Sequence, residues 1–133
     1  MRTKAREVAF QVVFASRFGE VENGLKNALY KKENLTKDDI QYCDRVLLLV
    51  EEHEKEFAQI IDERSVAFPE TRLFPADKSV LLVALAEIIH MADIPYAVSI
   101  NEAANIASKY SSEKSASFVS GILSEVKNND SCN

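Results

Sequence analysis

Two stretches decide the fold class of this chain: Pro95-Tyr96-Ala97-Val98-Ser99-Ile100-Asn101-Glu102-Ala103-Ala104 and Phe118-Val119-Ser120-Gly121-Ile122-Leu123. In the first stretch, Ser99 precedes Glu102 by three residues. That capping-box pattern predicts a helix over 99–110. In the second, apolar residues at helical spacing predict a last helix that begins after Ser111-Ser112. Two helices joined by a serine-rich turn place Tyr110 and Phe118 on either side of that turn.

Helical periodicity continues outward from these stretches toward the N-terminus. Apolar spacing predicts helices over 3–17 and 21–32, and the Thr36 and Asp39 pair is a capping-box variant that opens a longer segment. The pattern leaves open whether that segment is one helix or two helices with a bend near His53.

A central helix is expected over 78–91, with Asp77 as its cap. Apolar residues cover nearly the whole surface of this helix, which is typical of a helix at the centre of a fold. The connection before it contains Pro69 and Pro75, and prolines mark chain breaks. We therefore expect one domain over 1–133, with subdomains over roughly 1–66 and 67–133.

Composition supports an all-α protein. The 133 residues include 47% hydrophobic residues but only three glycines and three prolines, so turn-forming residues are scarce. The formal net charge of −5 argues against broad, non-specific nucleic-acid binding, which needs a basic field. A local basic patch or a basic protein partner remains compatible with this charge.

The sequence predicts a cytoplasmic protein. The longest apolar region, 80–92, is interrupted by Glu87 and His90 and is shorter than the roughly 18–20 residues that span a bilayer. The N-terminus is charged and has no long apolar core, so no signal peptide is expected. Cys43 and Cys132 lie far apart without metal-ligand spacing, which favours reduced thiols.

Residues for catalysis are scarce, and we expect no enzyme, no cofactor and no metal. His53 precedes Glu54, but the second histidine of a metalloprotease motif is absent. His90 lies at a helix end, where it can interact with the helix dipole. A structural role is the preferred interpretation for both histidines. The sequence also lacks a glycine-rich phosphate loop and a nucleophile elbow.

RNA binding has better support from the residues. Arg2, Lys4 and Arg6 cluster in the first helix, where basic side chains can pair with phosphates, although a few basic residues near an N-terminus are ordinary. Tyr110 and Phe118 could stack on single-stranded bases if their rings are exposed. The alternative is that both are core residues. This alternative is stronger for Phe118, which fits an apolar stripe, than for Tyr110, whose hydroxyl can face water.

Four blocks of this sequence resemble the NusB family of transcription antitermination factors. The segment 4–14 is similar to the opening A-R-E-x-A-x-Q-x-L-Y, with Phe14 where a tyrosine is common. The segment 81–88 aligns with the family's central helix. The segment 95–107 resembles P-x-x-V-x-I-N-E-A-x-x-L-A, and 118–123 resembles F-V-N-G-V-L with Ser120 at the asparagine. The blocks occur in the family's order across nearly the whole chain.

The resemblance implies an all-helical, NusB-like fold of about seven helices in two small bundles. It also implies a factor that pairs with NusE, a ribosomal protein of the small subunit. The pair would bind boxA RNA and join the elongating RNA polymerase and other Nus factors, chiefly during ribosomal RNA transcription. Whether this chain forms a homodimer stays open.

Family contacts carry over to two sets of residues. The implied RNA-binding residues are Arg2, Lys4, Arg6, Tyr110, Lys114, Phe118 and Ser120. The implied NusE side comprises Phe14, Asp77 and residues of the central helix, where acidic groups suit a basic partner.

Two positions of the central helix depart from the family pattern. Leu82 replaces a common arginine and Ala86 a common tyrosine, and the basic N-terminal extension is short. From these changes we expect weaker intrinsic RNA affinity and greater dependence on NusE.

Two alternatives to this function remain. One is a protein-interaction module with lost or weak RNA binding. The other is a domain related to those of ribosomal RNA methyltransferases, which the absence of a cofactor-binding domain after Leu123 disfavours.

Overall fold

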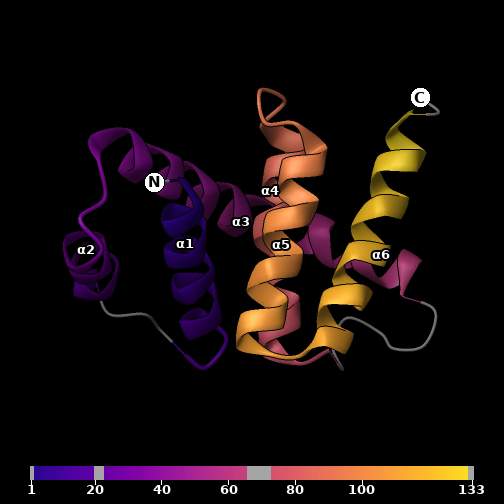
Figure 1. The fold of residues 1–133 in the computed structure, drawn as a ribbon, viewed down its shortest axis with the longest axis horizontal. Coiled ribbons are helices and arrows are strands. Elements are labelled where there is room, and N and C mark those ends of the chain that lie inside the picture. The colour runs from indigo at the N-terminus through magenta and orange to yellow at the C-terminus, as the bar shows by residue number, and fades with distance from the viewer. Residues whose placement is uncertain (1, 20–22, 66–72, 132–133) are drawn as a thin grey trace.

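The computed structural model describes residues 2–19, 23–65 and 73–131, and this part of the chain is built from helices without strands (Figure 1). The helices are α1 (Arg2–Ser16), α2 (Asn23–Lys32), α3 (Lys37–Arg64), α4 (Pro75–His90), α5 (Tyr96–Tyr110) and α6 (Glu113–Ser131). The all-α prediction is therefore confirmed, with six helices where about seven were expected. The difference lies in α3, which runs on through a kink at His53, where φ is −117° and ψ is 15°.

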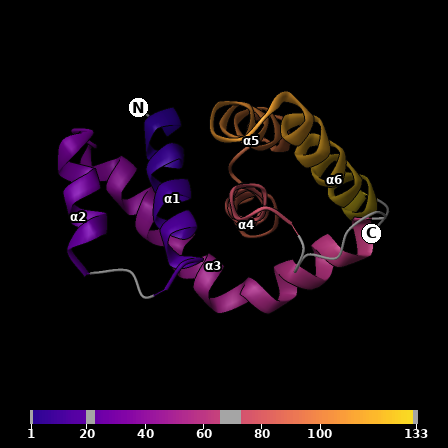
Figure 2. The ribbon, with the colours of Figure 1, turned by 90° about the horizontal axis from the view of Figure 1, so that it is seen from below.

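Helix α4 lies at the centre of the molecule, as its sequence predicts. Figure 2 shows α1, α3, α5 and α6 arranged around it, and α4 contacts all four. Every side chain from Val80 to Ala86 is buried. A helix that is apolar all round loses the most apolar area from water at this position, so burial of α4 organises the core.

Helix α3 connects the two ends of the fold. Figure 2 shows it running beneath the whole molecule, with α1 and α2 over its first half and α6 near its last turns. Buried residues from all six helices belong to one continuous hydrophobic cluster. The division into two subdomains stays a prediction, and the proline-containing connection that suggested it lies mostly in 66–72, outside the described residues.

Two of the expected helix starts are confirmed. Thr36 caps α3, since its Oγ1 accepts a hydrogen bond from the Asp39 backbone N at 3.1 Å. Ser112 precedes α6, and its Oγ accepts from the Ser115 backbone N at 3.1 Å. In both cases a short polar side chain satisfies an N–H that the first helical turn leaves free. The expected start of α2 at Val21 lies outside the described residues.

Two other starts were wrong by three residues. Helix α5 begins at Tyr96 after Pro95, not at Ser99, and α4 begins at Pro75, not at Lys78. Proline favours the first turn of a helix because its φ is already helical and it has no N–H to leave unpaired. Asp77 therefore lies inside the first turn of α4 and does not cap it.

None of the helices in the described ranges is long and apolar enough to cross a membrane.

Candidate RNA and partner interface

Arg2 and Lys4 lie at the N-terminal end of α1, and both pair with acidic residues of the chain. Arg2 contacts Asp38 at 2.8 Å and Asp39 at 3.3 Å, both at the start of α3. Lys4 Nζ lies 3.6 Å from Glu33. The Arg2–Asp38 and Lys4–Glu33 pairs are partly open to solvent, so they are weak and can exchange for a phosphate, whereas the carboxylate of Asp39 is buried. The two residues are accessible but partly neutralised.

Arg6 takes a different position, inside the core. Its guanidinium donates through Nε to Glu87 at 2.8 Å and through Nη1 to Glu102 at 3.0 Å, and the residue is only 5% exposed. Burial on its own would lower the pKa of Arg6, but the hydrogen bond and charge of Glu87 outweigh it, so the pKa is raised. This geometry favours a positioning role for Arg6 over direct contact with a phosphate.

Glu87 is the centre of this buried network. Its Oε2 also accepts from the Tyr42 hydroxyl, and its Oε1 accepts from Ser99 Oγ at 2.9 Å. Burial, reinforced by the charge of Glu87, raises the pKa of Tyr42, so this phenol stays protonated as a donor. Ser99 therefore links α5 to α4 through a tertiary hydrogen bond. It does not begin α5, although its sequence context predicted that it would.

Tyr110, at the end of α5, packs against α1. Its ring lies 4.9 Å from that of Phe10, and its hydroxyl donates to Glu7 and accepts from Gln11 Nε2 at 3.0 Å. Tyr110 as a whole remains 38% exposed. Lys109 lies beside it, with Nζ 2.6 Å from Glu7 and 5.4 Å from the Tyr110 ring centroid. An exposed tyrosine next to a lysine can stack with a base and approach its phosphate.

Phe118 and Lys114 lie on a different feature, a groove of about 320 Å³ between the start of α4 and the start of α6. The groove is lined by Leu73, Phe74, Asp77, Ser112, Lys114, Ser115 and Phe118. Phe118 is half-buried, so it is neither the exposed ring nor the core residue that the sequence left as alternatives. Ser120 is also half-buried and does not line the groove. Of the expected RNA residues, Arg2, Lys4 and Tyr110 thus lie at the α1 and α5 edge and Lys114 and Phe118 line the groove, whereas Arg6 is buried and Ser120 lies outside the groove.

Asp77, expected to face the partner, is buried in the floor of this groove. Its Oδ2 accepts from Ser115 Oγ at 3.1 Å, and its Oδ1 is buried without a hydrogen-bond partner. A buried carboxylate oxygen without a donor can accept a hydrogen bond from a ligand that enters the groove. Asp77 therefore presents one acceptor at the groove and not an exposed acidic edge.

Phe14 belongs to a row of aromatic rings along α1. Its centroid lies 5.8 Å from Phe10 and 5.1 Å from Phe18. Phe18 and Phe74 are about 70% exposed, at 69% and 70%, and neither was singled out from the sequence. Phe18 follows α1 and Phe74 precedes α4, and helical periodicity predicts nothing about residues outside a helix. A large apolar residue next to Gly19 or Pro75 could still have indicated an exposed contact surface.

The two departures from the family pattern lie in the core. Leu82 and Ala86 are fully buried in α4. Neither side chain faces a surface that RNA could reach, so the expected loss of RNA contacts at these two positions does not follow from the structure.

The fold and site define a class of protein: a helical domain organised around one apolar helix, with an aromatic and basic edge and a separate apolar groove. The chain belongs to the NusB family, whose family model matches residues 3–128.

Curated relatives are similar over nearly their full lengths. The transcription antitermination protein NusB of Ruminiclostridium cellulolyticum is 32% identical over 130 residues, which cover 97% of this chain and 90% of the relative. That of Natranaerobius thermophilus is 34% identical over 131 residues, covering 96% and 94%.

Solved structures agree with this assignment. The complex of antitermination factors NusB and NusE with dsRNA contains a chain with a TM-score of 0.85 and 25% identity, covering 96% of both chains. NusB of T. maritima has a TM-score of 0.84 and 29% identity, covering 95% of this chain and 89% of the other.

Proposed function

We propose that this protein is a non-catalytic transcription antitermination factor that binds boxA RNA together with NusE. The pair would join the elongating RNA polymerase and other Nus factors, chiefly during ribosomal RNA transcription. One observation carries the proposal: the whole described fold is similar to a NusB chain solved with NusE and dsRNA, over 96% of both chains. The network around Glu87 and the Tyr110 contacts lie within the aligned extent of the family model.

RNA would bind along the edge where α1 and α5 meet. Arg2, Lys4 and Lys109 offer cations that can leave surface carboxylates for phosphates. Tyr110 offers a ring face for one base. Arg6 would act indirectly, because its bonds to Glu87 and Glu102 hold α1 against α4 and α5.

NusE would occupy the groove at the starts of α4 and α6. Exposed Phe74 and half-buried Phe118 supply apolar contacts, and the free Oδ1 of Asp77 accepts a hydrogen bond. Phe14 lies outside this groove, on α1 next to Phe10, and would add a second NusE contact beside the RNA edge. Because the groove itself is separate from the RNA edge, each partner can raise the affinity of the other without competition.

The rival function is a protein-interaction module with weak or lost RNA binding. One observation favours it: Arg2, Lys4 and Lys109 are each paired with a carboxylate, and Arg6 is buried. These pairs reduce the positive field that RNA would meet.

Fluorescence anisotropy of a labelled boxA RNA distinguishes the two functions. The RNA is titrated with the protein alone and with NusE, and a scrambled RNA of the same length is the control. We expect preference for boxA and tighter binding with NusE. NusE binding without any preference for boxA would support the rival function.

Substitution of Tyr110 tests the site itself. Loss of one stacked base costs about 1–3 kcal/mol, so Tyr110→Ala should weaken boxA binding roughly 5- to 150-fold. Tyr96→Ala is the matched control, because Tyr96 is an exposed tyrosine at the opposite end of α5. Equal effects of the two substitutions would remove Tyr110 from the interface.

A further inference from the structure

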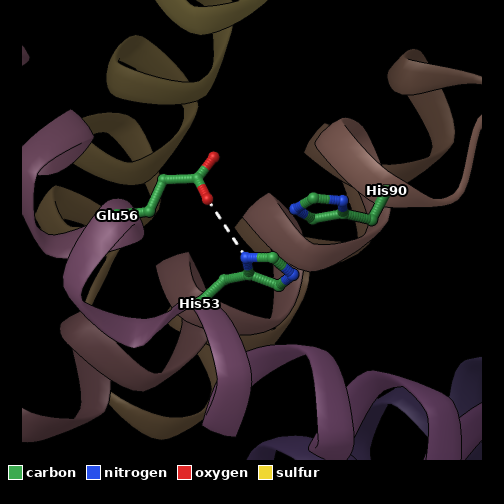
Figure 3. Close-up of side chains that lie close together, drawn as sticks. All are labelled: His53, Glu56 and His90. Atoms are coloured by element: carbon green, nitrogen blue, oxygen red, sulfur yellow. Dashed lines mark hydrogen bonds and ion pairs between the residues drawn. The ribbon is translucent and has the colours of Figure 1, made fainter.

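Three potential metal ligands gather at the kink of α3. His53, Glu56 and His90 lie there, and one ligand atom from each side chain falls within 4.8 Å of the others. Figure 3 shows the His90 ring pointing from the end of α4 toward His53 and Glu56 on α3. The two histidines are 37 positions apart in the chain, so the packing of α3 against α4 creates this cluster.

The His90 Nε2 atom is buried and has no hydrogen-bond partner. A buried ring nitrogen without a partner is unusual and needs an explanation, because desolvation of a polar atom costs free energy. The His90 ring stacks on His53 at a centroid distance of 4.1 Å and an angle of 22°, and Phe57 lies 5.9 Å from both rings. An apolar wall therefore stands on one side of the cluster.

Carboxylates surround the other side. His53 Nδ1 lies 3.1 Å from Glu56 Oε2, and His53 Nε2 lies 3.9 Å from Glu52 Oε2. His53 and Glu56 are three residues apart, which places them on one face of α3. The exposed Glu52 and Glu56 supply negative charge, so this corner attracts cations.

We propose that His53, Glu56 and His90 form a Zn²⁺ site that links α3 to α4. Two imidazole nitrogens and one carboxylate oxygen are ligands that suit zinc, whereas magnesium and calcium favour ligand sets of oxygen alone. Three protein ligands leave a fourth tetrahedral position for water or for Glu52. The site lies away from the edge proposed for RNA and from the groove proposed for NusE, and it goes beyond the proposed function.

Metal binding requires a small local rearrangement. Zinc bonds of 2.0–2.1 Å hold tetrahedral ligands about 3.3 Å apart, so ligand atoms that now lie within 4.8 Å of one another would close by at most about 1.5 Å. The exposed Glu56 side chain can make this movement by rotation. His53 must also rotate out of the ring stack, so that both ring lone pairs converge on one ion. The non-helical backbone at His53 gives this residue a direction that a regular helix would not.

The first test is isothermal titration calorimetry of the full chain with Zn²⁺ alone. Cys132→Ser is used as the background, since the Cys132 thiol could bind zinc independently. Cys43 does not interfere, because it is buried and burial raises its pKa to about 12. We expect one Zn²⁺ per chain and a Tm that rises by roughly 5–10 °C when zinc is in hundredfold excess over its dissociation constant. Failure to bind zinc would overturn the proposal.

Variants then identify the ligands. His53→Gln, Glu56→Gln and His90→Gln should each weaken zinc binding at least tenfold and, at the same zinc concentration, reduce the Tm shift by about half or more. Glu51→Gln, an exposed neighbour on α3, should bind like the background. Glu56→Gln is the decisive variant, because Glu56 is exposed and its replacement leaves the core intact. Unchanged zinc binding by Glu56→Gln or His90→Gln would contradict the proposal.

Cobalt substitution gives an independent readout. Co²⁺ bound by two histidines and a carboxylate should show tetrahedral visible bands without a thiolate charge-transfer band. A thiolate band would place the metal on cysteine and overturn the assignment.

Discussion

Arg6 shows how much a single residue can contribute to this fold from the inside. It joins α1 to α4 and α5 through Glu87 and Glu102, and both its partners are largely buried. Removal of one partner from a buried ion pair leaves the other charge without compensation. We expect Arg6→Ala to lower the free energy of unfolding by about 3–5 kcal/mol, measured by urea denaturation.

Lys4→Ala is the matched control for this substitution, since the Lys4–Glu33 ion pair is more open to solvent and should contribute within about 1 kcal/mol. The double variant Arg6→Met with Glu87→Leu should recover much of the loss, because both buried charges are then absent. A small effect of Arg6→Ala would show that Glu87 is satisfied by Tyr42 and Ser99 alone.

Glu7 provides a prediction about pH. Burial on its own would raise the pKa of Glu7, but hydrogen bonds from Lys109 and Tyr110 lower it below its usual value. A carboxyl group with a lowered folded-state pKa stabilises the fold above its unfolded pKa of about 4.3, and this contribution is lost as the pH falls through the folded-state pKa. Glu7→Gln should therefore be less stable than the wild type at pH 7.

Urea unfolding of both proteins between pH 7 and pH 3 measures this difference. It should be constant at the upper end of the range and shrink steadily at the acidic end. Glu51→Gln, on the surface of α3, is the control for a general charge effect. A difference that does not change down to pH 3 would exclude ionised Glu7 as its source.

At the scale of elements, α4 is the helix in which substitution by a charged residue should destabilise the fold most. Leu82, in the middle of this helix, is fully buried. A guanidinium placed there would lose its hydration without a prepared partner. We expect Leu82→Arg to lower the free energy of unfolding by more than about 4 kcal/mol and to leave the RNA affinity of the folded fraction unchanged.

Leu48→Arg is the control, because Leu48 on α3 is 53% exposed and should tolerate a charge within about 0.5 kcal/mol. Thermal unfolding followed by circular dichroism measures the stability of both variants. A stable Leu82→Arg protein with increased RNA affinity would mean that this position reaches the surface.

At the scale of the whole molecule, charge determines how RNA binding should depend on salt. The net charge is −5, and the RNA edge offers three basic residues outside the core, namely Arg2, Lys4 and Lys109. Each phosphate contact on a single strand contributes about −0.7 to the slope of log K against log salt. We expect a slope of about −2 or shallower for this protein alone and a steeper slope in the presence of NusE.

Anisotropy titrations at several potassium chloride concentrations measure this slope. Lys4→Gln should make it shallower by about 0.7, whereas Lys55→Gln, an exposed lysine on α3 away from α1 and α5, should leave it unchanged. A steep slope for the protein alone would require a larger basic surface than the α1 and α5 edge provides.

The sequence by itself determined the all-helical class, the central position of α4 and the caps at Thr36 and Ser112, because periodicity and capping depend on neighbouring residues. The tertiary structure decided the features that depend on contacts between residues far apart in the sequence. It buried Arg6 beside Glu87, used Ser99 for a bond to α4, and brought His90 onto His53. Local pattern could not predict these outcomes, because each depends on which helix faces which, and burial of apolar surface across the whole molecule makes that choice.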